Sequence, residues 1–150
     1  MGKRLKRPES VLVVIHTATP DFLLLNRLSP AFWQSVTGSM HWEETAPLET
    51  AVREVEEETG LAVSPDQLQD WGHTSQFEIL PQFSHRYADD VTHNREHLFS
   101  LCLETAVPIT INPKEHSEYR WVDANQALEM TWSWSNRDGI QRVIDQRLQQ

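Results

Sequence analysis

The stretch GSMHWEETAPLETAVREVEEETGL, residues 38–61, decides the fold of this chain. Its second half has the period of a helix, because one face collects the residues Leu48, Ala51, Val52, Val55 and Thr59. Pro47 suits the first turn of such a helix, and Gly60 suits its end. The pattern predicts a helix from about residue 47 to residue 59, with this face buried.

Glutamates crowd one edge of the predicted helix. Glu54 and Glu58 are one turn apart, and Glu57 lies roughly 60–100° from them around the axis. Like charges so close together destabilise a helix, whereas a hard divalent ion such as Mg²⁺ is held by a few carboxylates plus substrate phosphates. The sequence therefore predicts a metal site here, with Arg53 holding Glu57 in place and Glu56 pointing away to solvent.

The same stretch resembles the Nudix box in Gly38, Glu44 and the unbroken block REVEEETGL at 53–61. The family pattern has seven residues between its first Glu and its Arg, whereas eight separate Glu44 from Arg53. We expect the extra residue, near Pro47, to be absorbed where the loop enters the helix; the role of Glu44 stays open. Gly38 permits a tight backbone turn, so its carbonyl is a further candidate to face the metal.

Size and composition predict one globular domain spanning residues 1–150. The chain has 39% hydrophobic residues, no apolar run long enough to span a membrane, and no signal peptide behind its basic start. The single cysteine, Cys102, lies in the apolar run LFSLCLE and is expected to be buried in a strand. A cytoplasmic location follows as the default expectation.

The net charge of −9 argues against nucleic-acid binding, which needs a basic surface. A small phosphorylated substrate remains compatible with it, provided that metal ions and local cations neutralise the phosphates. Candidate cations are Lys3, Arg4, Lys6, Arg7 and Arg27. The sequence carries no signal for an oligomeric state.

Apolar and β-branched runs predict strands at 10–17, 22–27, 32–39, 68–80, 96–103 and 119–122, and helical patterns predict helices at about 124–130 and 136–148. The polar stretch between the two long strands is expected to be a loop. This order predicts a mixed sheet with helices on both faces, the α/β/α sandwich that the Nudix resemblance also implies.

Segments outside the box resemble those Nudix members that hydrolyse 7,8-dihydroneopterin triphosphate. They are RPESVLVVIHT at 7–17, FWQSVTGS at 32–39, FEIL at 77–80, HRY at 85–87, EHSEYRWVDA at 115–124 and SWSNRDGI at 133–140. The resemblance implies a Mg²⁺-dependent step of folate biosynthesis, with Mn²⁺ as a possible substitute, in which the substrate is split into dihydroneopterin monophosphate and pyrophosphate.

Residue roles follow from this resemblance. The implied metal ligands are Glu54, Glu58 and Glu115, with Glu57 assisting. The implied substrate contacts are Lys6, Arg27, Thr37, Phe77, Glu78, Ile79, Leu80 and Ser133. Phe77 is equally typical of core packing, and Ser133 of a helix start. Members of the family usually recruit a carboxylate from beyond the box; the candidates are Glu78, Glu96, Glu104, Glu115 and Glu118, of which we favour Glu115, with Glu118 as a surface charge.

Two other functions are compatible with the same fold and box. The same fold and box serve broader nucleoside triphosphate pyrophosphatases that remove damaged or canonical nucleotides. A non-catalytic binding module on this fold typically has lost glutamates from the box. All three helix glutamates are present here, which favours an enzyme.

Overall fold

The computed structural model describes residues 5–149, so Lys3 and Arg4 lie outside the described residues. A seven-stranded mixed sheet forms the centre. Its strands are β1 (Glu9–Thr17), β2 (Phe22–Arg27), β3 (Trp33–Gln34), β4 (Val36–Ser39), β5 (Leu68–Glu78), β6 (His93–Leu103) and β7 (His116–Val122). The helices are α1 (Pro47–Thr59), α2 (Ala124–Met130) and α3 (Trp134–Leu148), with short 3₁₀ turns η1 (Pro65–Gln67) and η2 (Pro81–Arg86).

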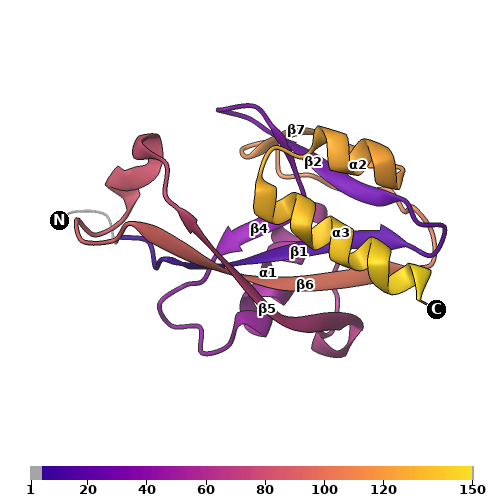
Figure 1. The fold of residues 1–150 in the computed structure, drawn as a ribbon, viewed down its shortest axis with the longest axis horizontal. Helices are drawn as coiled ribbons and strands as arrows, with labels where there is room; N and C mark the ends of the chain where they lie inside the picture. The colour runs from indigo at the N-terminus through magenta and orange to yellow at the C-terminus, as the bar shows by residue number, and fades with distance from the viewer. Residues whose placement is uncertain (1–4, 150) are drawn as a thin grey trace.

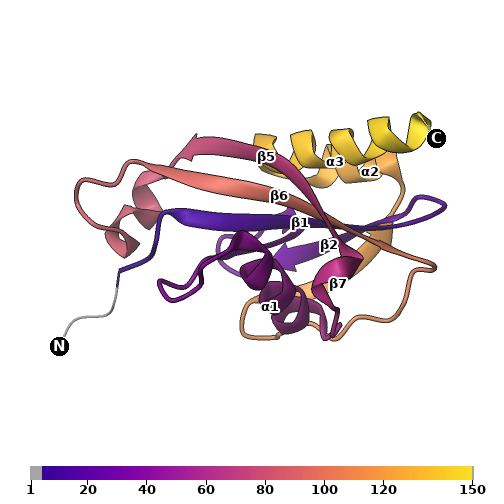
Figure 2. The ribbon, with the colours of Figure 1, turned by 90° about the horizontal axis from the view of Figure 1, so that it is seen from below.

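Strand β1 lies in the middle of the sheet because it is apolar on both sides. Val11, Val13 and Ile15 pack in one core with α1, while Leu12 and Val14 pack in a second core with α3. Such two-sided burial is typical of a strand with a parallel neighbour, and β1 pairs in parallel with β6. Figure 2 shows α1 on one face of the sheet and α2 and α3 on the other. The predicted α/β/α sandwich is confirmed.

Helix α1 has the predicted limits. Pro47 occupies the first turn, and Gly60 ends the helix with a left-handed φ of 78°, its N–H donating to the Glu56 carbonyl at 2.9 Å. Ala51, Val55 and Thr59 are buried as predicted. Helix α1 is continuous from Pro47 to Thr59, so Glu54, Glu57 and Glu58 keep one helical register.

The predicted strand at 32–39 is wrong as one element, because the chain changes its pairing partner at Ser35. Trp33 and Gln34 pair with β2, whereas residues 36–39 pair with β1. Between them, the Ser35 N–H donates to the Asn136 side chain on α3 at 2.8 Å, so it takes no part in a ladder. A buried asparagine from the last helix thus divides the strand.

Other boundaries differ from the predictions through pairing that the sequence does not display. Strand β6 begins at His93 because it pairs with β5 down to Glu78, and part of the predicted loop between them is the η2 turn. Helix α3 starts at Trp134, capped by Ser133. The predicted burial of Cys102 is wrong: it is exposed near the end of β6, where Arg147 of α3 approaches its sulfur at 3.9 Å.

The main cleft lies where strands β2 and β4, which both pair with β1, separate from each other. Strand β4 pairs with residues 10–13 of β1, while β2 touches β1 only at the pair His16–Phe22. Beyond that pair β2 turns away from β1 together with its neighbour β7 (Figure 1). A cleft of about 1320 Å³ is lined by residues of α1, β4, β6, β7 and the start of α3. No helix within residues 5–149 is long and apolar enough to cross a membrane.

Candidate active site

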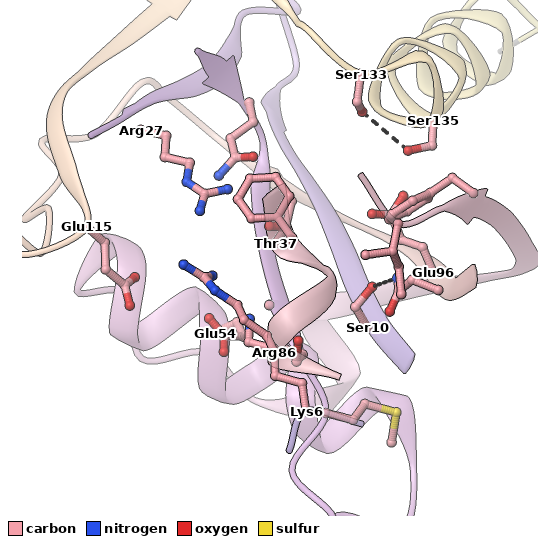
Figure 3. A pocket seen from close by; sticks show the side chains of 18 of the residues that line it. Lys6, Ser10, Arg27, Thr37, Glu54, Arg86, Glu96, Glu115, Ser133 and Ser135 are labelled. Carbon is pink, nitrogen blue, oxygen red and sulfur yellow. Dashed lines mark hydrogen bonds between the residues drawn. The ribbon is translucent and has the colours of Figure 1, made fainter. Parts of the chain in front are cut away.

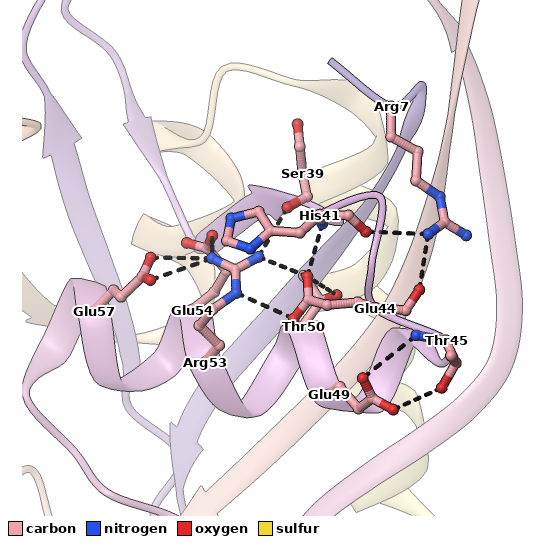
Figure 4. Close-up of polar contacts among 10 residues, drawn as sticks. All are labelled: Arg7, Ser39, His41, Glu44, Thr45, Glu49, Thr50, Arg53, Glu54 and Glu57. Carbon is pink, nitrogen blue, oxygen red and sulfur yellow. Dashed lines mark hydrogen bonds and ion pairs between the residues drawn. The ribbon is translucent and has the colours of Figure 1, made fainter. Parts of the chain in front are cut away.

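Arg53 organises the acidic side of the cleft (Figure 4). Its guanidinium donates twice to the Glu44 carboxylate, at 2.9 and 3.1 Å, and to Glu54 at 2.7 Å and Glu57 at 3.2 Å. It also donates to the Ser39 carbonyl at 3.0 Å. The planar fork of arginine suits such multiple contacts. One side chain therefore ties the preceding loop, strand β4 and helix α1 together.

Glu44, whose role the sequence left open, positions Arg53. Its carboxylate also accepts from the His41 N–H at 2.7 Å and from the Thr50 hydroxyl at 2.9 Å. Partial burial opposes ionisation, but the hydrogen bonds from Arg53, His41 and Thr50 lower the pKa of Glu44 to about 2. Glu44 therefore reaches Arg53 although eight residues separate the two positions.

Glu54 and Glu58 are buried side by side under the cleft. Glu58 is 1% exposed, and its Oε2 has no hydrogen-bond partner among residues 5–149. Burial raises the pKa of Glu58 well above its ordinary value, and the neighbouring Glu54 and Glu115 charges raise it further. Burial also raises the pKa of Glu54, against the opposing effect of Arg53. Such a pair is unfavourable without a cation. Glu56 and Glu57 are exposed.

Gly38 serves Glu54 in a way the sequence did not indicate. It lies inside strand β4, paired with Val11, and not in the tight turn that we expected. A Cβ at this position would come within 2.1 Å of the Glu54 carboxyl carbon. The glycine is therefore required because the Glu54 carboxylate lies directly against the strand backbone.

Glu115 and His116 approach Glu58 from the start of β7. The three side chains can place one ligand atom each within 4.8 Å of one another. His116 is 3% exposed, and its Nε2 lies 3.5 Å from Glu58 Oε1. In the part of the chain that the structure describes, neither ring nitrogen has a hydrogen-bond partner. Burial and the nearby Arg27 charge lower the pKa of His116, so the ring is neutral and can offer a lone pair. Buried, unpartnered oxygen and nitrogen atoms fit a divalent cation.

The other carboxylates that were candidates beyond the box lie elsewhere. Glu118 is exposed on β7 and pairs with Arg120 at 3.1 Å, as expected for a surface charge. Glu78 and Glu104 are exposed. Glu96 is buried on β6, at the opposite end of the cleft from Glu115 (Figure 3).

Cations face the carboxylates across the cleft. Figure 3 shows Lys6, Arg27 and Arg86 directed toward the space beside Glu54 and Glu115. Desolvation and the charges of Arg86 and Arg27 lower the pKa of Lys6, as expected for cations gathered without enough counter-charge. Arg27 also lies against the Phe83 ring, 5.1 Å from its centre. Arg86 lies in the HRY segment at 85–87, but its sequence position alone indicated no role for it.

The remaining predicted substrate contacts line the same cleft: Thr37, Phe77, Glu78, Ile79, Leu80 and Ser133. Phe77 is half-buried, whereas Glu78 is exposed. Ser133 also caps helix α3, because its hydroxyl accepts from the Asn136 N–H at 3.1 Å. Both readings of Ser133, helix start and cleft wall, therefore describe its position.

The fold and this acidic helix place the chain in one class. A family model described as the NUDIX domain matches residues 6–143, and the chain belongs to the Nudix family, as its residues indicated. The chain is 46% identical over 143 residues to the dihydroneopterin triphosphate diphosphatase of Escherichia coli (strain K12), covering 93% of both chains. It is 41% identical to the enzyme of the same name from Haemophilus influenzae (strain ATCC 51907 / DSM 11121 / KW20 / Rd), covering 93% of this chain and 89% of the relative.

Solved structures agree with this assignment. The E. coli dihydroneopterin triphosphate pyrophosphohydrolase superposes with a TM-score of 0.83 at 44% identity, covering 93% of this chain and 97% of that one. A NUDIX hydrolase from Listeria monocytogenes superposes with a TM-score of 0.77 at 28% identity, covering 95% of each chain.

Proposed function

We propose that this protein hydrolyses 7,8-dihydroneopterin triphosphate to the monophosphate and pyrophosphate, with Mg²⁺ as its metal. The observation that carries the proposal is that a cluster of carboxylates and a cluster of cations line the same cleft. Glu54, Glu58 and Glu115 line the same cleft as Lys6, Arg27 and Arg86, and Figure 3 shows the three cations around Glu54 and Glu115. A triphosphate with a divalent ion fits between them, because the ion meets the carboxylates while the phosphates meet the cations. The choice of a pterin as the ring of the substrate follows from the names of the two diphosphatase relatives.

The carboxylates and the cations have separate roles in this proposal. A divalent ion supplies charge neutralisation on the phosphates and polarisation of the phosphoanhydride. Glu54 and Glu58 would hold it from α1 and Glu115 from the residue before β7, with Glu57 assisting from the exposed edge and the neutral His116 beside Glu58. Arg53 keeps Glu54 and Glu57 in place. Lys6, Arg27 and Arg86 orient the phosphates, and the polar and aromatic wall from Thr37 to Phe77 and Ser133 receives the ring.

Kinetics on competing substrates test the proposal. We expect kcat/KM for 7,8-dihydroneopterin triphosphate to exceed the values for dATP and 8-oxo-dGTP, with pyrophosphate released only when Mg²⁺ or Mn²⁺ is added. A tenfold or greater preference for a nucleotide would assign the chain to the nucleotide pyrophosphatases instead. Absence of metal-dependent pyrophosphate release from all three compounds would indicate a binding module.

A further inference from the structure

A group of buried polar side chains lies at the end of the cleft away from Glu115. Asn94 and Glu96 come from β6, Ser10 from β1, and Ser135 from the first turn of α3. Figure 3 shows Ser10, Glu96 and Ser135 together, with Thr37 between them and the acidic helix. Asn94 is 3% and Glu96 is 8% exposed. The site described above uses none of these four side chains.

Strand geometry places this group where the second core gives way to the cleft. Side chains two residues apart on a strand lie on one face, so Asn94, Glu96 and Leu98 form one row on β6. Leu98 packs in the core under α3, whereas the two polar residues line the cleft. The row changes from apolar to polar at the point where packing against α3 ends and a ligand has room to enter.

One buried polar atom of this row, Asn94 Oδ1, has no partner within residues 5–149. Asn94 donates to the Ser10 hydroxyl at 2.7 Å, but no described residue bonds its buried Oδ1. Glu96 has a neutral neighbour, the Ser135 hydroxyl, and burial raises the pKa of Glu96 to about 7. Buried polar atoms are nearly always paired, and leaving one unpaired is costly. When Glu96 is ionised, the end of the cleft presents its two carboxylate oxygens, which lie beside the Ser135 hydroxyl, and the Asn94 Oδ1.

We propose that Glu96 and Asn94 bind the 2-amino edge of the pterin ring and determine which ring the enzyme accepts. The inference rests on the proposed function and adds the residues that recognise its substrate. The 2-amino group and the neighbouring ring N3–H carry three N–H donors on one edge. The carboxylate accepts one N–H from each of these groups in parallel, and Asn94 Oδ1 accepts the remaining amino N–H. Phe77, opposite Asn94 in the β5–β6 pairing, borders the same space.

This arrangement selects rings by their donors. Guanine shares the amino group and the adjacent ring N–H, whereas adenine has an amino group without that ring N–H. A ring without these donors leaves the buried acceptors unpaired, and sites built to bond a polar group discriminate strongly against analogues that lack it. Glu96 and Asn94 are thus specificity-determining residues that act on the ring, far from the phosphates.

The variant Glu96→Gln tests the assignment, because it keeps the size of the side chain and replaces one acceptor oxygen by a donor. We expect kcat/KM for 7,8-dihydroneopterin triphosphate to fall by about 10- to 100-fold, the range for a lost charge-assisted hydrogen bond. Binding of dihydroneopterin itself, followed by fluorescence titration, should weaken by a similar factor. Binding of pyrophosphate with Mg²⁺, measured by calorimetry, should stay within twofold. The matched control is Glu104→Gln, an exposed change just beyond β6, which should alter none of these values.

Several results would overturn the inference. One is a Glu96→Gln enzyme that keeps kcat/KM and dihydroneopterin affinity within twofold of the wild type. Another is an equal loss of pyrophosphate affinity, which would indicate damage to the whole cleft. If the wild-type enzyme does not hydrolyse the pterin triphosphate at all, the proposed function fails, and the variant is then compared on dGTP and dATP. A loss confined to dGTP supports ring recognition by Glu96, and an equal loss on both nucleotides overturns it.

Discussion

The Glu54 and Glu58 side chains are buried one helical turn apart, and one Glu58 oxygen lacks a hydrogen-bond partner among the described residues. Their burial raises both pKa values, which means that the folded chain holds the pair at a cost in stability. Proteins retain destabilising buried charges where function needs them, and binding of a metal ion with a phosphate ligand would offset the destabilisation by these two carboxylates.

Replacing Glu58 by Gln keeps the side chain's size and removes its charge. We expect a loss of several kcal/mol of transition-state stabilisation, seen as a fall in kcat of about 100-fold or more, because charge stabilisation through a held metal is of that order. Steady-state kinetics with saturating Mg²⁺ measure it. The matched variant Glu56→Gln changes an exposed residue of the same helix and should be nearly silent. Near wild-type kcat in Glu58→Gln would remove α1 from the metal site.

Glu96 makes stability depend on pH. Its pKa of about 7 in the folded protein lies above the ordinary value of 4.5, so the folded state binds more protons than the unfolded state between these values. This contribution therefore lowers stability as pH rises from 4.5 to about 7, and the loss is complete above 7. We expect Glu96→Gln to be more stable than the wild type by about 2–3 kcal/mol at pH 8. Urea unfolding should find little difference near pH 4.5; an equal difference at both pH values would contradict this.

The contact of strand β4 with helix α1 depends on the missing side chain of Gly38. A methyl group there overlaps the Glu54 carboxyl, which is the flexible end of its side chain and can move aside. We expect Gly38→Ala to fold with a small change in Tm but to bind Mn²⁺ about 10- to 100-fold more weakly, the range seen when the support of a ligand is removed. Calorimetric titration with Mn²⁺ measures this. Unchanged affinity would show that Glu54 does not ligate from its present position.

Local sequence predicted the elements whose causes are local. Helix α1 carries its own stop and its own buried face, and β1 is apolar along its length, so both appear where expected. The break at Ser35 comes from Asn136, a hundred residues further along the chain, and no local pattern reports it. Burial of Cys102 was mispredicted for the same reason, because an apolar run does not show how far α3 covers β6.

The candidate site divides in the same way. The glutamates and arginine of the box have a spacing that identifies them, and Glu115 was favoured for its place in the family pattern. The roles of His116, Asn94 and Arg86 could be recognised only in the folded structure. They depend on atoms without hydrogen-bond partners among the described residues and on neighbours from other parts of the chain. Glu96 was named as a candidate carboxylate, but the sequence could not place it at the opposite end of the cleft from Glu115.

For the molecule as a whole, a metal ion should stabilise the fold by relieving repulsion between buried carboxylates. At a Mg²⁺ concentration 100 times the Kd, binding adds about 2.7 kcal/mol. For a chain of this size we expect Tm to rise by about 5–10 °C. Differential scanning calorimetry with Mg²⁺ and then with excess EDTA tests it. Glu58→Gln should lose most of the shift and Glu104→Gln should keep it; a shift that survives in Glu58→Gln would place the ion elsewhere.

The cleft is assembled from two faces of the sheet, with α1 packed in one core and the row of Asn94, Glu96 and Leu98 directed to the other. Mutations that alter the ring-binding end therefore leave the packing of the hydrolytic helix intact. During evolution, substitutions at a few positions of β6 can change which ring is bound, while the residues that act on the phosphates stay the same. The separation of the two faces makes the scaffold evolvable.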